Sequence, residues 1–193
     1  MRLLLILVLL QLPISSYAVE STGEVNPERA TASEMLRLPE LCQIRFEYGP
    51  RGKEFSKWKK ILGPEYIHIH HYCKGLVQLM RLNKQKRHWK GDLNSAKKNF
   101  NYVISRVQNP KFVLLPDLYY RMAIIATEEN NSPEAASFAN KSIQAKKNYL
   151  NPYLLLADTY LKLGNREQAK QILLQAQKYH PNSKRLSSKL KQL

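Results

Sequence analysis

The densest group of side chains that could ligate a metal ion lies within six consecutive residues. It contains His68, His70, His71 and Cys73. Imidazole nitrogens and a thiolate are suitable ligands for zinc or copper. On a helix, residues three positions apart share a face, which divides these four side chains into two pairs on two different faces. We therefore predict no metal cofactor, and metal handling by this cluster stays open as an alternative.

The chain has two cysteines, Cys42 and Cys73. In an oxidising compartment a lone pair of cysteines usually forms a disulfide. We predict this bond, which would join the N-terminal part of the chain to a helix that starts near residue 66. On the chain-entropy model a loop of this length stabilises the fold by roughly 3–4 kcal/mol. The disulfide explains Cys73 more simply than a metal site does.

The sequence contains no residue pattern typical of a catalytic site. There is no nucleophile elbow, no glycine-rich phosphate loop and no HExxH motif. The adjacent carboxylates Glu128 and Glu129 lack a companion base that the sequence can place, and so do Glu34 and Glu40. We predict that the protein is not an enzyme and needs no cofactor.

The first 18 residues differ from the rest of the chain. Arg2 precedes a run from Leu3 to Leu12 that is apolar except at Gln11, and small residues follow at Ser16 and Ala18. Ten residues are too few to span a bilayer as a mature helix. We predict a signal peptide over residues 1–18, cleaved near Ala18, and a periplasmic or secreted protein. An uncleaved N-terminal anchor is the alternative.

The chain is strongly basic, with 31 Lys and Arg residues against 15 Asp and Glu residues and a net charge of +16. Such a charge attracts polyanions and anionic surfaces. In an exported protein it makes anionic polysaccharide or a membrane surface a possible partner and nucleic acid an unlikely one. We predict a basic patch at Arg81, Lys84, Lys86, Arg87, Lys90, Lys97 and Lys98. A solvated loop would explain the same residues without a ligand.

Two segments near the C-terminus repeat one pattern of apolar and small residues. In residues 150–183 the pattern falls at Tyr153, Leu156, Ala157, Tyr160, Ala169, Leu173, Ala176 and Pro181. In residues 116–149 it falls at Tyr119, Met122, Ala123, Ala126, Ala135, Ala139 and Ser142, with Lys147 in place of the proline. Gly164-Asn165 can end one helix and begin the next. Each segment therefore predicts two amphipathic helices joined by a tight turn.

This pattern resembles the tetratricopeptide repeat family. The resemblance implies an all-α fold, a short solenoid of helical hairpins. We expect a mobile arm over residues 19–38 and a cap over 39–63, which together form an N-terminal unit over 19–63. A degenerate helical pair over 64–110 precedes the repeats at 116–149 and 150–183, and residues 184–193 would form a capping helix.

The resemblance also implies where a partner protein would bind, because first helices of such repeats line a concave groove. The groove positions would be Asp117, Tyr120, Arg121, Ile124, Thr127, Asn151, Leu154, Asp158 and Leu161. They lack the Lys and Asn set with which chaperone-binding members hold a C-terminal carboxylate. We expect an amphipathic helix or an extended apolar-basic segment as the partner. Simple packing of Leu154 and Leu161 against a neighbouring helix is the alternative.

Together these features predict an exported interaction scaffold, in an envelope assembly such as polysaccharide export or pilus-type machinery. Direct binding of an anionic polymer through the basic patch is the alternative function. Metal handling by the histidine cluster is the second alternative.

Overall fold

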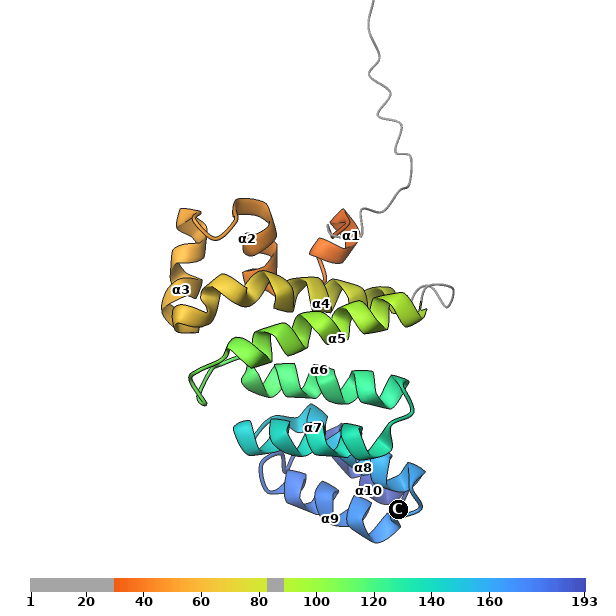
Figure 1. Cartoon of the computed structure of the whole chain (residues 1–193). Coiled ribbons are helices and arrows are strands. Elements are labelled where there is room, and N and C mark those ends of the chain that lie inside the picture. Colours follow the sequence, from red (N-terminus) through yellow and green to blue (C-terminus); the bar gives the residue numbers. More distant parts are fainter. Residues whose placement is uncertain (1–29, 83–88) are drawn as a thin grey trace, which may run out of the picture.

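The computed structural model describes residues 30–82 and 89–193, which form helices and no β-strand. Three pairs of long helices are stacked along the molecule (Figure 1). They are α4 (Ile69–Leu82) with α5 (Trp89–Arg106), α6 (Leu115–Glu128) with α7 (Ser132–Ala145), and α8 (Leu150–Lys162) with α9 (Arg166–Gln177). A shorter helix, α10 (Lys184–Lys191), follows the last pair. The predicted all-α class built of helical hairpins is therefore confirmed.

The turns between the paired helices follow from residues that end and begin helices. The side chain of Asn131 accepts a hydrogen bond from the Glu134 backbone N–H at 3.3 Å and caps α7. Gly164 has a φ of 77°, a left-handed conformation that glycine adopts without strain, and it ends the turn after α8. Ser183 caps α10 in the same way as Asn131 caps α7.

Small residues allow the helices of a pair to approach closely. Ala123, Ala157 and Ala169 are fully buried. In the first pair Gly75 has this role, because a Cβ built on it would lie 2.7 Å from the ring of Phe100. Contacts this short are not tolerated between carbon atoms, so any larger residue would push α4 and α5 apart. Close packing of the pairs is thus determined by the sequence at these sites.

A tyrosine marks the same place in the first helix of each pair. Tyr72 lies edge-on to Phe100, with ring centroids 6.1 Å apart. Tyr119 stacks on Phe138 at 6.4 Å, and Tyr153 lies near the ring of Tyr179 at 6.5 Å. With these tyrosines aligned, α4 corresponds to α6 and α8, which makes the first pair a third hairpin of the same stack.

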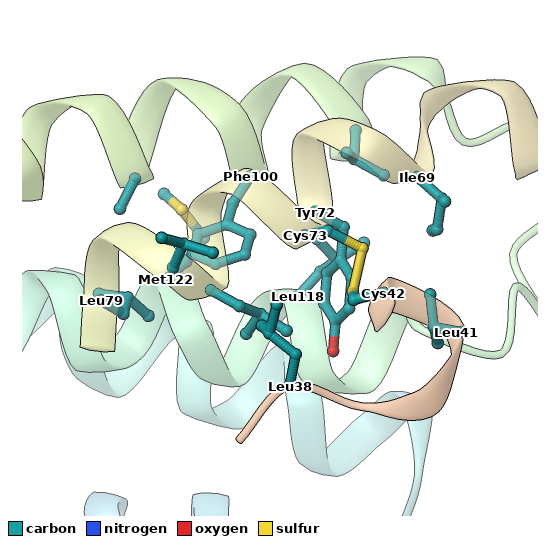
Figure 2. Close-up of a cluster of buried hydrophobic side chains, with 14 of the residues drawn as sticks. Leu38, Leu41, Cys42, Ile69, Tyr72, Cys73, Leu79, Phe100, Leu118 and Met122 are labelled. Atoms are coloured by element: carbon teal, nitrogen blue, oxygen red, sulfur yellow. A yellow bond between two sulfur atoms is a disulfide. The ribbon is translucent and has the colours of Figure 1, made fainter. Parts of the chain in front are cut away.

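Short helices cover the α4 end of the stack. They are α1 (Ala32–Met35), α2 (Glu40–Tyr48) and α3 (Ser56–Leu62), with 3-10 turns at Lys53–Phe55 and Gly63–His68 (Figure 1). The predicted disulfide is present and joins Cys42 of α2 to Cys73 of α4, with Cα atoms 5.4 Å apart. Figure 2 shows this bond beside Leu41 and Tyr72. The N-terminal helices are thus covalently fixed to the stack.

The expectation of a mobile arm over residues 19–38 is wrong for residues 30–38. Leu38 is 4% exposed and belongs to the main hydrophobic cluster, together with Leu118 and Met122 of α6 (Figure 2). Glu34 is also 4% exposed, and its carboxylate pairs with Arg81 of α4. Leu38, the Glu34–Arg81 ion pair and the partly buried Ala30 and Met35 hold this segment, a signal too small for composition to reveal. Residues 19–29 lie outside the described part of the chain.

No helix within residues 30–82 or 89–193 combines the length and apolar character needed to cross a membrane. The predicted signal peptide, residues 1–18, lies outside the described residues and stays a prediction.

Candidate protein-binding groove

The first helices of the last two pairs form an open cavity of about 380 Å³. Tyr120 and Ile124 of α6 and Leu154 and Leu155 of α8 supply its apolar lining, which we call the floor. Arg185 of α10 closes one side. The cavity therefore lies where adjacent hairpins meet, on the face formed by first helices.

Most of the groove residues predicted from the repeat pattern meet at this cavity. Those that line it are Tyr120, Ile124, Thr127, Asn151, Leu154 and Asp158. Asp117 and Arg121 do not line it; they bind each other, and Arg121 lines the second cavity described below. Leu161 also lies outside the lining, with 38% of its surface exposed.

The Asp117 carboxylate is the centre of a polar network between three helices. One oxygen, Oδ2, accepts hydrogen bonds from the Tyr72 hydroxyl at 2.7 Å and from Arg121 Nε at 3.1 Å. The other, Oδ1, accepts a hydrogen bond from the Tyr149 hydroxyl at 2.8 Å. Tyr72 belongs to α4 and Tyr149 precedes α8, so the network fixes the first helices relative to one another. It makes the wall of the groove rigid instead of offering a charge to a partner.

The network also changes the proton affinity of its members. Burial raises the pKa of Tyr72 well above its ordinary value, and the charge of Asp117 raises it further. The pKa of Tyr149 is raised for the same two reasons. Burial alone would lower the pKa of the Arg121 guanidinium. The charge of Asp117 and its hydrogen bond outweigh this effect and raise the pKa. Both phenols therefore stay protonated and remain hydrogen-bond donors at neutral pH.

A second cavity of about 530 Å³ adjoins the first. It lies between residues 37–39, Leu76 and Leu79 of α4, and Arg121 of α6. Ile124 and Glu128 line both cavities. The two cavities therefore form one continuous groove across α4, α6 and α8.

Charged side chains surround the first cavity, and several were missed by sequence reasoning. Lys162 Nζ donates a hydrogen bond to Asn130 Oδ1 at 2.8 Å, and Arg185 donates one to Asn151 Oδ1 at 3.1 Å. Lys189 of α10 pairs with Asp158. The spacing of residues within one repeat does not show which side chains of the following helix contact that repeat. The contact of Arg185 with the groove therefore could not be predicted from the sequence.

At the first pair, the corresponding face of α4 is covered by the chain itself. Cys73 and Arg81 of α4 bind Cys42 and Glu34 respectively. Arg81 Nε lies 2.9 Å from Glu34 Oε1, and both side chains are almost fully buried. Burial alone would raise the pKa of Glu34, but the hydrogen bonds from Arg81 and Thr31 lower it. We call residues 30–42 the covering segment.

The predicted basic patch has partners inside the protein at two of its positions. Arg81 pairs with Glu34, and Lys97 Nζ lies 2.6 Å from Glu129 and 3.6 Å from Glu134. Lys98 is exposed. Lys84, Lys86 and Arg87 lie outside the described residues, as does the side chain of Lys90. The basic patch as a whole therefore stays a prediction.

The side chains of the histidine cluster contact neighbouring residues of the protein. Cys73 is in the disulfide, so its sulfur is not a free ligand. His70 Nδ1 lies 3.0 Å from the Ile67 carbonyl oxygen, and His71 Nδ1 lies 2.7 Å from Asn99 Oδ1. The ring of His68 packs edge-on against Tyr102. Within the described ranges, no three His, Cys, Asp or Glu side chains are grouped so that they could hold a metal ion.

Comparison with protein families finds one match in the C-terminal part. A family described as tetratricopeptide repeat matches residues 126–193, from the C-terminal end of α6 through α10. A search of curated proteins found no match. The family match covers the α8–α9 hairpin and the helix that follows it, and so includes the floor at Leu154 and the side of the cavity at Arg185.

Proposed function

Since residues 126–193 are a tetratricopeptide-repeat region, we propose that this protein is a scaffold that binds a segment of another protein in the groove of α6, α8 and α10. Proteins of this family are generally non-enzymatic scaffolds for protein–protein interaction. The observation that carries the proposal is the open cavity with an apolar floor between α6 and α8. Concave surfaces of helical repeats are suited to long, narrow ligands.

The chemistry of the groove supports a peptide segment as the ligand. Four apolar side chains offer area that a partner can bury, at roughly 25 cal/mol per Å². The Asp117 network holds α4, α6 and the start of α8 in place, so little ordering is needed when a partner binds. A preformed groove of this kind keeps the entropy cost of association low.

We further propose that the scaffold is exported and serves an envelope assembly, such as polysaccharide export or pilus-type machinery. The signal-like residues 1–18 support export. The Cys42–Cys73 disulfide agrees with an oxidising compartment. Direct testing of location requires fractionation of the native host, with the processed N-terminus read by mass spectrometry.

Site-specific photo-crosslinking in the native host tests the scaffold role. A photoreactive residue replaces Thr127, which is exposed at the groove, and a matched control replaces Leu174, which is exposed on α9 outside it. We expect a discrete protein adduct from the Thr127 position that withstands high salt, and none from Leu174. Equal labelling at both positions would contradict the proposal. Salt-sensitive retention on an anionic glycan without a protein adduct would favour polymer binding, which the net charge of +16 suggests.

A further inference from the structure

We propose that the N-terminal helices carry a binding site for a phosphate monoester, formed by Arg45 of α2 and His70 of α4. The site is separate from the groove, because neither residue lines its two cavities. The proposal is therefore independent of the scaffold function. It is carried by a half-buried guanidinium without a counter-ion and by an imidazole ring beside it.

The register between α2 and α4 brings these two side chains together. The covering segment runs antiparallel to α4, and its last residue, Cys42, is bonded to Cys73. Arg45 lies three residues after Cys42, and His70 lies three residues before Cys73. Residues three apart share a face of a helix, so both side chains lie on the faces that the disulfide joins. The charge of Arg45 accordingly acts on His70.

Arg45 is a positive charge that the described part of the chain does not neutralise. Its Nε is enclosed without a hydrogen-bond acceptor, and the guanidinium has no carboxylate partner within residues 30–82 and 89–193. Burial lowers its pKa, since no acid nearby offsets the loss of water. A guanidinium binds phosphate oxygens through two parallel hydrogen bonds, so a phosphate group at its terminal nitrogens would supply the missing negative charge.

His70 distinguishes a phosphate monoester from other oxyanions. Its Nδ1 lies 3.0 Å from the Ile67 carbonyl oxygen, which can only accept, so Nδ1 carries the hydrogen and Nε2 of the neutral ring carries a lone pair. Burial lowers its pKa to about 4, and the nearby charges of His71, Arg45 and Lys74 contribute, so the ring is neutral at neutral pH. The Nε2 lone pair repels a carboxylate or sulfate oxygen but accepts the hydrogen of a P–OH group. A phosphate monoester has a second pKa of about 6 and can provide that hydrogen.

Neighbouring rings hold His70 in position. It stacks on His71 with ring centroids 4.2 Å apart. His71 is fixed in turn by a hydrogen bond of 2.7 Å to Asn99 of α5 and by the ring of Tyr102, 4.0 Å away between centroids. Since α2 is bonded to α4, both phosphate-binding side chains lie on fixed elements, and binding requires little ordering.

Isothermal titration calorimetry of the full chain, with its disulfide intact, tests the site. The probe is glucose 1-phosphate, and the control ligand is dimethyl phosphate, a diester without an ionisable hydrogen. The variants are Arg45→Gln, His70→Gln and the matched control Arg51→Gln, since Arg51 is exposed beyond the end of α2. Circular dichroism checks that each variant is folded.

We expect glucose 1-phosphate to bind more tightly than dimethyl phosphate. Arg45→Gln should weaken its binding about tenfold, and Arg51→Gln should leave it unchanged. Titrations in buffers of different ionisation enthalpy should show proton uptake by the wild type, because most of the free ester has lost its second proton at neutral pH. In His70→Gln both the proton uptake and the preference for the monoester should disappear. Equal binding by Arg45→Gln and the wild type would overturn the proposal, and so would equal losses in Arg45→Gln and Arg51→Gln or equal affinity of the wild type for the two esters.

Vesicles of phosphatidylcholine with phosphatidic acid identify the source of the ester. Binding to these vesicles, weakened by Arg45→Gln and stronger than binding of glucose 1-phosphate, would assign the site to a lipid headgroup. Binding of glucose 1-phosphate alone would assign it to a phosphorylated sugar. Binding of neither would refute the site and leave the groove and its Thr127 adduct unaffected.

Discussion

Replacement of Asp117 by alanine should destabilise the protein far more than replacement of another first-helix aspartate. Asp117 accepts three hydrogen bonds, two from phenols and one from a guanidinium. Hydrogen bonds to a charged group contribute about 1.5–3 kcal/mol each, and the contributions of a shared acceptor do not add fully. Tyr72, 3% exposed, would also keep a buried hydroxyl without its partner. We expect a loss of about 3–5 kcal/mol in the free energy of unfolding.

The matched control is Asp158→Ala. Asp158 also lies on a first helix and pairs with a cation, but 56% of its side chain is exposed. Exposed ion pairs contribute about 0–1 kcal/mol. Urea unfolding followed by circular dichroism measures both variants. For a chain of this size, the Asp117 variant should also melt roughly 10 °C lower. A loss for Asp117→Ala no larger than that for Asp158→Ala would refute the role given to the network.

Three further results are expected. Reduction of the Cys42–Cys73 disulfide should lower the free energy of unfolding by roughly 3–4 kcal/mol, measured in urea with and without reductant; an unchanged midpoint would contradict this. Gly75→Ala should cost about 1–3 kcal/mol because of its contact with Phe100, read as a lower melting temperature. The pKa of His70 is lowered to about 4, first by burial and then by nearby positive charges. The unfolded chain binds a proton at His70 near pH 6.5 and the folded chain only near pH 4, so the free energy of unfolding should fall as the pH falls from 6.5 towards 4. The pKa of His68 is lowered as well, by burial first, so His70→Gln should reduce this pH dependence without removing it.

The helical hairpins could be predicted because their determinants are local. Ala157 and Ala169 recur at fixed distances from Tyr153, and the turn at Gly164 follows from conformational preference alone. The same short-range pattern located most of the floor, since Tyr120 and Leu154 occupy equivalent positions in successive repeats. Each repeat contains this periodic pattern by itself, so the pattern can be recognised without knowledge of the rest of the chain.

The rest depends on contacts between residues distant in sequence. Asp117 binds Tyr72 and Tyr149, which precede and follow it by 45 and 32 residues. Arg185 reaches Asn151 across 34 residues. Hydrophobic periodicity carries no information on such polar pairings, because it shows which face of a helix is apolar and not which polar atoms meet across helices. Their roles follow from the stacking of the helices.

The covered face of α4 gives the groove a direction. Because Glu34, Leu38 and the disulfide hold the covering segment against α4, residues 37–39 bound the second cavity at the first hairpin. A segment bound along the groove would meet residues 37–39 at this end, so the covering segment sets a limit to the length of the ligand. The disulfide in this way contributes to the shape of the groove as well as to the stability of the fold.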